Sequence, residues 1–186
     1  MPEPVNASEL THQNIKVSVI TVCFNSNQTI SKTLRSVSSQ THQNIEHILV
    51  DGGSSDGTLE TIQDFKHVAQ LVSEKDKGIY NAMNKGIAMS NGAIISILNS
   101  DDLYHDHLVV ENIVSTFIES KADIVYGDIC YFKGSAKLIT RSWSAGNFYK
   151  GSFAKGWHPP HPAVFIKKSL YLTQGLFDET IPISAD

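Results

Sequence analysis

The stretch Ala-Ile-Ile-Ser-Ile-Leu-Asn-Ser-Asp-Asp, residues 93–102, decides the fold. Its first six residues are largely apolar and end at a polar turn that holds two adjacent carboxylates, Asp101 and Asp102. An apolar run bounded by turn residues is typical of a strand buried on both faces at the centre of a parallel sheet. Because ligands of open α/β sheets bind beyond the carboxyl ends of such strands, this turn is a candidate site.

The turn combines Asp101 and Asp102 with Asn99, and oxygen-bearing side chains of this kind are the ligands that Mg²⁺ and Mn²⁺ prefer. A metal ion held here would keep coordination positions free for substrate phosphate. The alternative is a polar turn that only closes the strand. The local sequence leaves both interpretations open.

Strand-like and helix-like segments alternate before residue 120. The expected strands are residues 15–24, 45–50, 68–72 and 93–98. The expected helices carry apolar residues at helical spacing within 30–37, 59–65, 78–90 and 108–118. This order predicts the α/β fold class, with a mostly parallel central sheet that is flanked by helices and joined by right-handed crossovers.

The C-terminal third follows a different pattern. Strand-like residues 124–131 and 138–140 flank Lys133-Gly134-Ser135, which is a hairpin signal. An aromatic, glycine-rich stretch at 143–157 suits a substrate-binding loop. A strand at 163–166 and a helix at 168–172 are expected after it. The sequence therefore predicts a small antiparallel element beside the parallel sheet.

The composition is that of an ordinary globular domain. The chain has 186 residues, enough for one domain, and its formal net charge of −4 argues against a nucleic-acid partner. Cys23 and Cys130 lie in apolar surroundings, so we expect buried free thiols. The sequence shows neither a signal peptide nor an apolar run of about 18 residues. The expected location is the cytoplasm, with peripheral attachment to the inner face of the cytoplasmic membrane left open.

Successive parallel strands deliver their carboxyl ends to one edge of a sheet, so four polar loops should meet there. Asn25 follows the first strand, Asp51 the second and Asp76 the third, and the turn at 99–102 follows the fourth. The glycine-rich loop after Asp51 matches neither the phosphate-loop pattern nor the dinucleotide fingerprint. Its carboxylate is suited to accept hydrogen bonds from a base or a ribose; the alternative is a purely structural role in the turn.

Four ordered motifs carry a resemblance to a known family. They are Val-Ser-Val-Ile-Thr-Val-Cys-Phe-Asn at 17–25, Val-Asp-Gly-Gly-Ser-Ser-Asp-Gly-Thr at 50–58, Asp-Lys-Gly-Ile-Tyr-Asn-Ala-Met-Asn-Lys-Gly at 76–86 and Leu-Asn-Ser-Asp-Asp at 98–102. In order and spacing they resemble family 2 glycosyltransferases of the GT-A (Rossmann-like) fold, over about residues 16–186. The resemblance implies an inverting transferase of the hexosyl or N-acetylhexosaminyl type, a nucleotide-sugar donor, usually a UDP-sugar, and a divalent Mn²⁺ or Mg²⁺ ion.

The resemblance also implies which residues bind the nucleotide. Phe24 matches the aromatic residue that packs on the base, and Asn25 lies beside it. Asp51 matches the residue that hydrogen-bonds the base. Asp76 is expected to face the nucleoside, with Asn84 supporting it from the following helix.

At the metal turn, the resemblance makes Asp101 the expected metal ligand, because it matches the last acid of the Asp-x-Asp motif, with Asp102 as its helper. Asn99 departs from the family pattern because it takes the place of the first acid. One formal charge is therefore missing, and a weaker affinity for metal is expected. The amide can still bind a ribose or a metal-bound water, so Asn99 is grouped with the nucleotide-binding residues.

The acceptor side is expected in the C-terminal third. Residues 157–165 resemble the family's His-x-x-x-Phe strand entrance, which makes Trp157 and His161 candidate contacts of donor or acceptor. Ala185-Asp186 matches the pair whose Asp is the general base. Structural alternatives stay open, since Trp157 is equally suited to packing in the core and His161 to fixing the local loop.

The resemblance divides the chain into an N-terminal extension, residues 1–14, and a GT-A domain, residues 15–186. The nucleotide-binding part is expected at 15–102 and the acceptor-side part at 103–186. Family members normally continue past the position of Asp186, so the chain is expected to be truncated.

The expected function is sugar transfer to a saccharide or lipid-linked acceptor in surface or exopolysaccharide biosynthesis of the cell envelope. The alternative is a nucleotide-sugar-binding domain without transferase activity in this form. A sugar-nucleotide pyrophosphorylase is disfavoured, because no glycine-rich loop with a basic residue follows the first expected strand. The sequence leaves the oligomeric state open.

Overall fold

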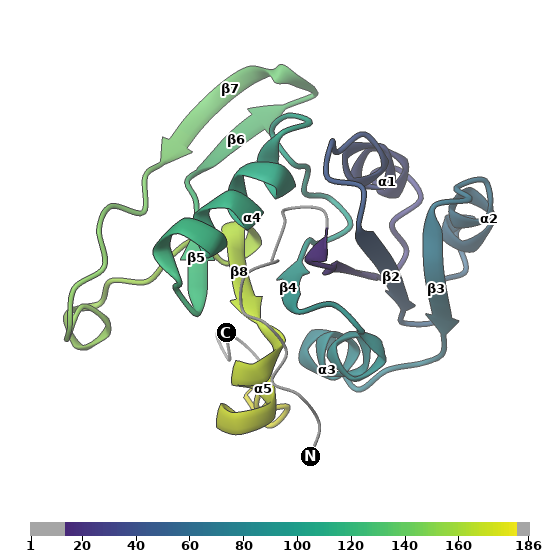
Figure 1. Cartoon of the computed structure of the whole chain (residues 1–186). Helices are drawn as coiled ribbons and strands as arrows, with labels where there is room; N and C mark the ends of the chain where they lie inside the picture. The colour runs from purple at the N-terminus through teal and green to yellow at the C-terminus, as the bar shows by residue number, and fades with distance from the viewer. Residues whose placement is uncertain (1–13, 182–186) are drawn as a thin grey trace.

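The computed structural model describes residues 14–181, with the backbone alone at 135–137. Its main layer is a six-stranded sheet in the order β3-β2-β1-β4-β8-β5, and β6 and β7 form a separate two-stranded sheet. Figure 1 shows α1, α2 and α4 on one face of the main sheet and α3 and α5 on the other. The predicted α/β architecture with a small antiparallel element is confirmed.

The bounds of the elements agree with most of the expected segments. The strands are β1 Val17–Cys23, β2 Ile45–Asp51, β3 Val68–Ser73, β4 Ile94–Ile97, β5 Ile124–Tyr126, β6 Ile129–Lys133, β7 Ser135–Trp143 and β8 Val164–Lys167. The helices are α1 Ile30–Ser38, α2 Thr58–Gln63, α3 Ile79–Met89, α4 Val109–Ser120 and α5 Lys168–Gln174. Two short 3₁₀ helices, at Phe153–Lys155 and His161–Ala163, precede β8.

The parallel half of the sheet forms the centre of the domain. β1 pairs in parallel with β2 and β4, and β2 pairs in parallel with β3. Every residue of β1 and β4 is buried, because helices cover both faces of these strands. Val110, Val114 and Phe117 of α4 pack on one face, and Met83 and Ile87 of α3 pack on the other. Burial on both faces explains why these strands appear as apolar runs in the sequence.

The expected single strand at 124–131 is wrong. The chain leaves the main sheet after Tyr126 and enters the two-stranded sheet at β6. At the break, the Gly127 amide donates to the Ala163 carbonyl oxygen at 3.0 Å, and the Asp128 carboxylate accepts a hydrogen bond from the Ala145 amide at 2.9 Å. These contacts with distant residues end the strand, so the local sequence did not reveal the break.

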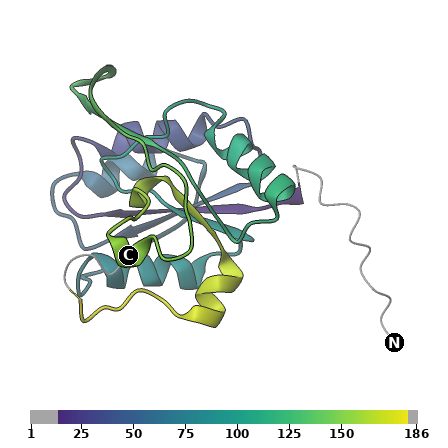
Figure 2. The same ribbon diagram turned by 90° about the vertical axis from the view of Figure 1, so that its left-hand side faces the viewer.

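The β6–β7 hairpin turns at Gly134, whose φ of 70° suits glycine, as the hairpin signal predicts. The hairpin extends away from the main body on the side opposite α3 and α5 (Figure 2). Cys23 is buried in β1, but the expected burial of Cys130 is wrong because this residue is exposed on β6.

No helix within residues 14–181 has the length and apolar character needed to cross a membrane. Apart from Asn14, the predicted N-terminal extension lies outside the described residues. The division into a nucleotide-binding part and an acceptor-side part stays a prediction.

Candidate functional site

Three loops meet at the carboxyl ends of β1, β2 and β4. The Asn25 amide donates to Ser54 Oγ at 2.7 Å, and the Ser55 amide donates to Asn25 Oδ1 at 3.0 Å. Ser26 Oγ and Ser100 Oγ are hydrogen-bonded at 2.8 Å. Residues far apart in sequence thus form one polar edge, as the parallel order of the strands predicts.

Phe24 and Asp76 lie on either side of a bare stretch of backbone at Gly52. A Cβ atom at Gly52 would lie 2.7 Å from Asp76 Oδ2, so Asp76 would have to shift, and 3.4 Å from Phe24 Cδ2, which is an ordinary contact. Asp76 Oδ1 accepts a hydrogen bond from the Gly78 amide at 2.9 Å. The Phe24 ring is 62% exposed. An exposed ring beside an anchored carboxylate is suited to a planar group that carries N–H donors.

Asp51 lies below this surface and is fully buried. Its Oδ2 accepts hydrogen bonds from the amides of Gly53 and Ser54, at 3.1 and 3.0 Å, and from Ser73 Oγ at 2.6 Å. Its Oδ1 accepts a further bond from Ser54 Oγ. Burial raises the pKa of Asp51, but the donors of Ser54, Ser73 and Gly53 outweigh burial and hold this pKa below its ordinary value. Asp51 therefore organises the glycine-rich loop from within, and its contact with a base stays a prediction.

The turn after β4 holds Asn99, Asp101 and Asp102. The Asp102 amide donates to the Asn99 carbonyl oxygen at 3.0 Å, and Asn99 Nδ2 donates to Asp102 Oδ2 at 3.3 Å. Asn99 Oδ1 is buried and has no hydrogen-bond partner among residues 14–181. Asp101 is exposed. Burial, together with the charge of Asp101, raises the pKa of Asp102 to about 6, although the bond from Asn99 opposes this shift.

These features fit a divalent cation at the turn. A buried amide oxygen without a donor is costly unless a ligand satisfies it. Two neighbouring carboxylates, Asp101 and Asp102, repel each other until a cation offsets their charge. No cluster of three or more histidine, cysteine or acidic side chains within residues 14–181 could hold a metal by itself. A hard cation that binds to one or two carboxylates and to substrate phosphate needs no such cluster.

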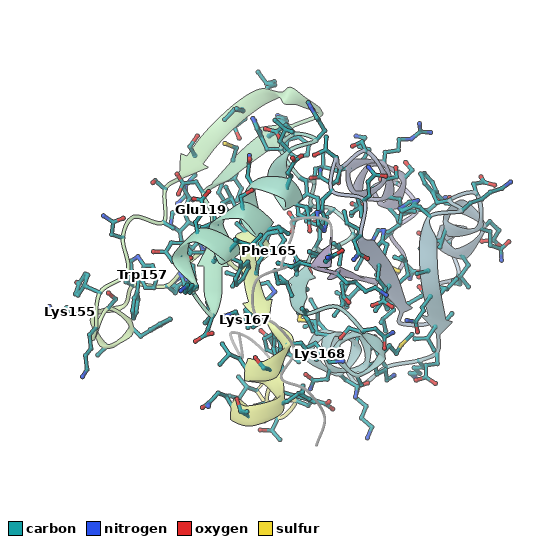
Figure 3. The ribbon with its side chains drawn as sticks, in the orientation of Figure 1. Glu119, Lys155, Trp157, Phe165, Lys167 and Lys168 are labelled. Atoms are coloured by element: carbon teal, nitrogen blue, oxygen red, sulfur yellow. The ribbon has the colours of Figure 1, made fainter. Side chains whose placement is uncertain are left out.

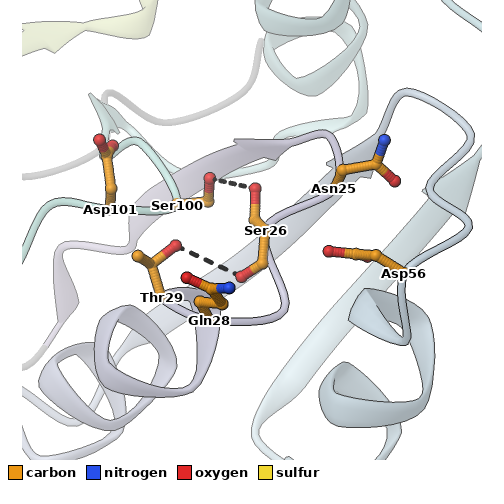
Figure 4. A pocket seen from close by; sticks show the side chains of 7 residues that line it. All are labelled: Asn25, Ser26, Gln28, Thr29, Asp56, Ser100 and Asp101. Carbon is orange, nitrogen blue, oxygen red and sulfur yellow. Dashed lines mark hydrogen bonds between the residues drawn. The ribbon is translucent and has the colours of Figure 1, made fainter.

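A polar cleft of about 340 Å³ lies beside Asp101 (Figure 4). Its lining comprises Asn25, Ser26, Gln28, Thr29, Asp56, Ser100 and Asp101. Ser26 and Ser100, which join the first and fourth loops across the cleft, were not among the predicted site residues. Their positions directly after strands at the same sheet edge were the available signal.

Asn84 holds the C-terminal segment to α3. Its side chain donates to the Phe177 carbonyl oxygen and to Glu179 Oε1, each at 2.9 Å, and accepts from the Phe177 amide at 3.0 Å. Asn81 donates to the other oxygen of Glu179 at 2.9 Å. The hydrogen bonds described for the Asn84 side chain therefore run to Phe177 and Glu179. None of them runs to Asp76, so the predicted support of Asp76 by Asn84 stays a prediction.

Trp157 lies in an aromatic cluster on the loop before β8, where Figure 3 shows it beside Lys155. Its Nε1 donates to the Ala145 carbonyl oxygen at 2.6 Å, and its ring contacts Phe148, Phe153 and Tyr126 with centroids 5.4 to 5.6 Å apart. These contacts favour the packing role that the sequence left open.

His161 begins the 3₁₀ helix before β8, and its ring lies 6.1 Å from the Phe177 ring. It therefore contacts the segment that Asn84 holds. Asp186, the predicted general base, lies outside the described residues. The sites assigned to His161 and Asp186 stay predictions.

Comparison with known proteins identifies the family. The family model "Glycosyl transferase family 2" matches residues 18–167, which include the strand ends and the turn described above. The chain belongs to glycosyl transferase family 2. The glycosyltransferase Rv1514c of Mycobacterium tuberculosis is 33% identical over 175 residues, which cover 91% of this chain and 65% of that protein. The glycosyltransferase AglE of Haloferax volcanii is 36% identical over 119 residues, covering 61% of this chain and 39% of AglE.

Solved structures confirm the GT-A fold of this family 2 glycosyltransferase chain. S. aureus TarS 1-349 in complex with UDP aligns with a TM-score of 0.72 at 16% identity, over 92% of this chain and 52% of that one. The mannosyltransferase PcManGT of Pyrobaculum calidifontis, in complex with GDP-Man and Mn²⁺, aligns with a TM-score of 0.68 at 20% identity, over 90% of this chain and 48% of PcManGT. The chain therefore spans less than two thirds of the length of these curated relatives and solved structures.

Proposed function

We propose that this chain transfers a hexosyl or N-acetylhexosaminyl group from a UDP-sugar, with inversion, to a saccharide or lipid-linked acceptor. The observation that carries the proposal is the turn after β4, where a buried amide oxygen without a partner lies beside two carboxylates. A cation at this turn would satisfy Asn99 Oδ1 and offset the charges of Asp101 and Asp102. Family membership and the UDP bound to TarS support this choice of donor.

The nucleoside would bind over Gly52, between Phe24 and Asp76. Phe24 offers an exposed ring for stacking, and Asp76 offers an oxygen that faces the same space. Asn25 fixes the loops beside Phe24 through its bonds with Ser54 and Ser55. Asp51 keeps the glycine-rich loop in the shape that leaves Gly52 open. Phe24 and Asp76 would therefore contact the nucleoside, whereas Asn25 and Asp51 would hold the loops beside it.

Asp101, with Asp102 and Asn99, would hold the metal, Mn²⁺ or Mg²⁺, at the diphosphate. The Mn²⁺ named in the PcManGT complex supports this assignment. The ion, when bound, offsets the negative charge that grows on the departing diphosphate. The chain's own contribution is to fix the turn, because the Ser26–Ser100 bond and a bond from Thr33 Oγ1 to the Ser100 carbonyl oxygen hold it in place, at 2.8 and 2.9 Å.

Inverting transfer is a single displacement at the anomeric carbon. The acceptor oxygen forms the new bond while the bond to the diphosphate breaks, and the proton of the acceptor hydroxyl passes to a carboxylate. We assign that carboxylate to Asp186. We also propose a role in surface-polysaccharide or glycolipid biosynthesis, which the name of a 27% identical relative, "PGL/p-HBAD biosynthesis glycosyltransferase", supports.

A nucleotide-sugar-binding domain without transferase activity is the second candidate, because the described residues hold the polar strand edge and the metal turn that would bind the donor. Isothermal titration of this chain with UDP, with and without Mn²⁺, tests donor binding, and release of UDP from UDP-sugars tests turnover. Metal-dependent binding together with turnover supports the transferase, and binding alone supports the second candidate. Equal weak binding with and without Mn²⁺ would contradict both.

A further inference from the structure

The two adjacent carboxylates of the metal turn face two cavities of opposite character. Asp101 lines the polar cleft of about 340 Å³, and Asp102 lines a second cavity of about 920 Å³. The second cavity lies between the metal turn, α4, β5 and the β6–β7 hairpin. A single turn therefore separates a small polar space from a large one.

The larger cavity is mostly apolar. Phe165 lines it from β8, Leu98 from the segment after β4, Val109 and Ile113 from α4, and Ile129 and Ile139 from the hairpin. Aliphatic and aromatic side chains together form most of the lining, and Ile139 remains 47% exposed. The volume lies within the range of sites that bind small organic molecules.

The polar residues in the lining restrict the chemistry of the occupant. Asp102 and His105 lie where the cavity meets the metal turn, and Asp128 lies at the break between β5 and β6. The described lining contains neither lysine nor arginine. It therefore offers no lysine or arginine to pair with a fatty-acid carboxylate, whereas the acidic side chains can accept hydrogen bonds from the hydroxyl groups of a neutral head group.

We propose that this cavity binds the alkyl chain of a lipid-linked acceptor, with the hydroxyl-bearing head group at the Asp102 end. The inference rests on the proposed function and chooses between its two acceptor classes. The continuity between cavity and metal turn supports it, because Asp102 belongs to both. An alkyl chain in the cavity would leave its sugar or polyol head at the turn where the donor diphosphate is expected. A purely saccharide acceptor would leave the apolar walls facing water.

The test compares n-octyl β-D-glucoside, below its critical micelle concentration, with methyl β-D-glucoside. The two probes share a head group and differ only in the alkyl chain. Binding to the 186-residue chain is measured by isothermal titration and by ligand-observed NMR. We expect the octyl glucoside to bind about tenfold or more tightly than the methyl glucoside, because only its chain buries apolar surface.

Asn112→Trp is the variant that blocks the cavity. Asn112 lines the cavity from α4 and is exposed, so a large side chain can enter the open space without disturbing the core. Glu119→Trp is the matched control, because Glu119 is exposed on the same helix (Figure 3) and does not line the cavity. Thr116→Trp, at a second exposed lining position, repeats the block independently. Circular dichroism verifies that each variant folds.

Loss of octyl glucoside binding in Asn112→Trp and Thr116→Trp, with binding retained in Glu119→Trp, supports the proposal. Equal binding of the two glucosides, or undiminished binding in both blocking variants, overturns it. A dimer of the parent chain that Asn112→Trp dissociates also overturns it, because a second copy would then fill the cavity. UDP titration separates this proposal from the proposed function. Metal-dependent UDP binding without octyl glucoside binding refutes only the lipid site in the cavity. Octyl glucoside binding without metal-dependent UDP binding refutes only the proposed donor site.

Discussion

The Asp76 carboxylate occupies the space that a side chain at Gly52 would fill, with Oδ2 only 2.7 Å from the Cβ position. The two residues lie after β2 and β3, and the Phe24 ring lies 3.4 Å from the same position. Any larger residue at position 52 would push this carboxylate away, because the carboxylate comes so close to the backbone. The geometry leads to a direct test of the donor site.

Gly52→Ala is expected to displace Asp76 and to weaken UDP binding about tenfold, the effect of losing one hydrogen bond to a charged group. Isothermal titration with Mn²⁺ measures the loss. Gly127→Ala is the matched control, because a Cβ atom there meets only Ala163 at an ordinary 3.9 Å. Unchanged affinity in Gly52→Ala would remove Asp76 from the nucleoside site.

Asp101→Asn is expected to abolish the difference between UDP affinities with and without Mn²⁺, because the exposed carboxylate of the metal turn is lost. The same titrations of Asp64→Asn serve as control, since Asp64 is an exposed acid at the end of α2. If Mn²⁺ still strengthens UDP binding in Asp101→Asn as in the parent chain, Asp101 is not the metal ligand.

Asp51→Ala is expected to lower the free energy of unfolding by about 1–3 kcal/mol, because Gly53, Ser54 and Ser73 lose their hydrogen bonds to a charged acceptor. Urea denaturation measures this loss, and titration measures the weaker UDP binding expected with it. Ser73→Ala removes one of these bonds and keeps the carboxylate. Weakened UDP binding in Asp51→Ala but not in Ser73→Ala supports a role of the Asp51 carboxylate in the donor site; unchanged UDP affinity in Asp51→Ala contradicts such a role.

His47 makes the stability of the chain depend on pH. The residue is fully buried in β2, where it is hydrogen-bonded to Thr21 and His67. Burial, followed by the proximity of His67, lowers the pKa of His47 to about 3. The unfolded chain, with an ordinary histidine pKa of about 6.5, binds a proton that the folded chain does not take up. The contribution of His47 to the free energy of unfolding is therefore fully present above pH 6.5, and it is lost as the pH falls toward 3.

The expected contribution of His47 to this loss is about 1.4 kcal/mol per pH unit well below pH 6.5, and His67, whose pKa burial also lowers, acts in the same direction. Urea denaturation between pH 7 and 5 measures the slope. His47→Gln should make the slope shallower, and His105→Gln, at an exposed position, should leave it unchanged. Identical slopes in the parent chain and His47→Gln would refute this assignment.

Asp186→Asn is expected to leave metal-dependent UDP binding unchanged and to abolish sugar transfer, because the amide cannot accept the proton of the acceptor hydroxyl. UDP titration and a transfer assay measure the two properties separately. Retained turnover in the variant would exclude Asp186 as the general base.

The sequence by itself determined the architecture of residues 15–120. The apolar runs at β1 and β4 record burial on both faces, and the alternation of segments dictates parallel strands whose carboxyl ends share one edge. The meeting of the loops that contain Asn25 and Ser100 follows from that topology. These features were predictable because strand and helix periods are local properties of the chain.

Only the tertiary structure decided how the side chains divide their roles. Asp51 ends β2 and Asp76 follows β3, yet Asp51 is enclosed by its own loop and Asp76 faces the space over Gly52. The break at Gly127 depends on Ala163, and the bonds of Asn84 depend on Phe177, which lies 93 residues further along the chain. The apolar cavity lies between the hairpin, α4 and the metal turn, three segments that are distant in sequence. Such outcomes rest on which distant segments come into contact, and local patterns of polarity carry no record of those contacts.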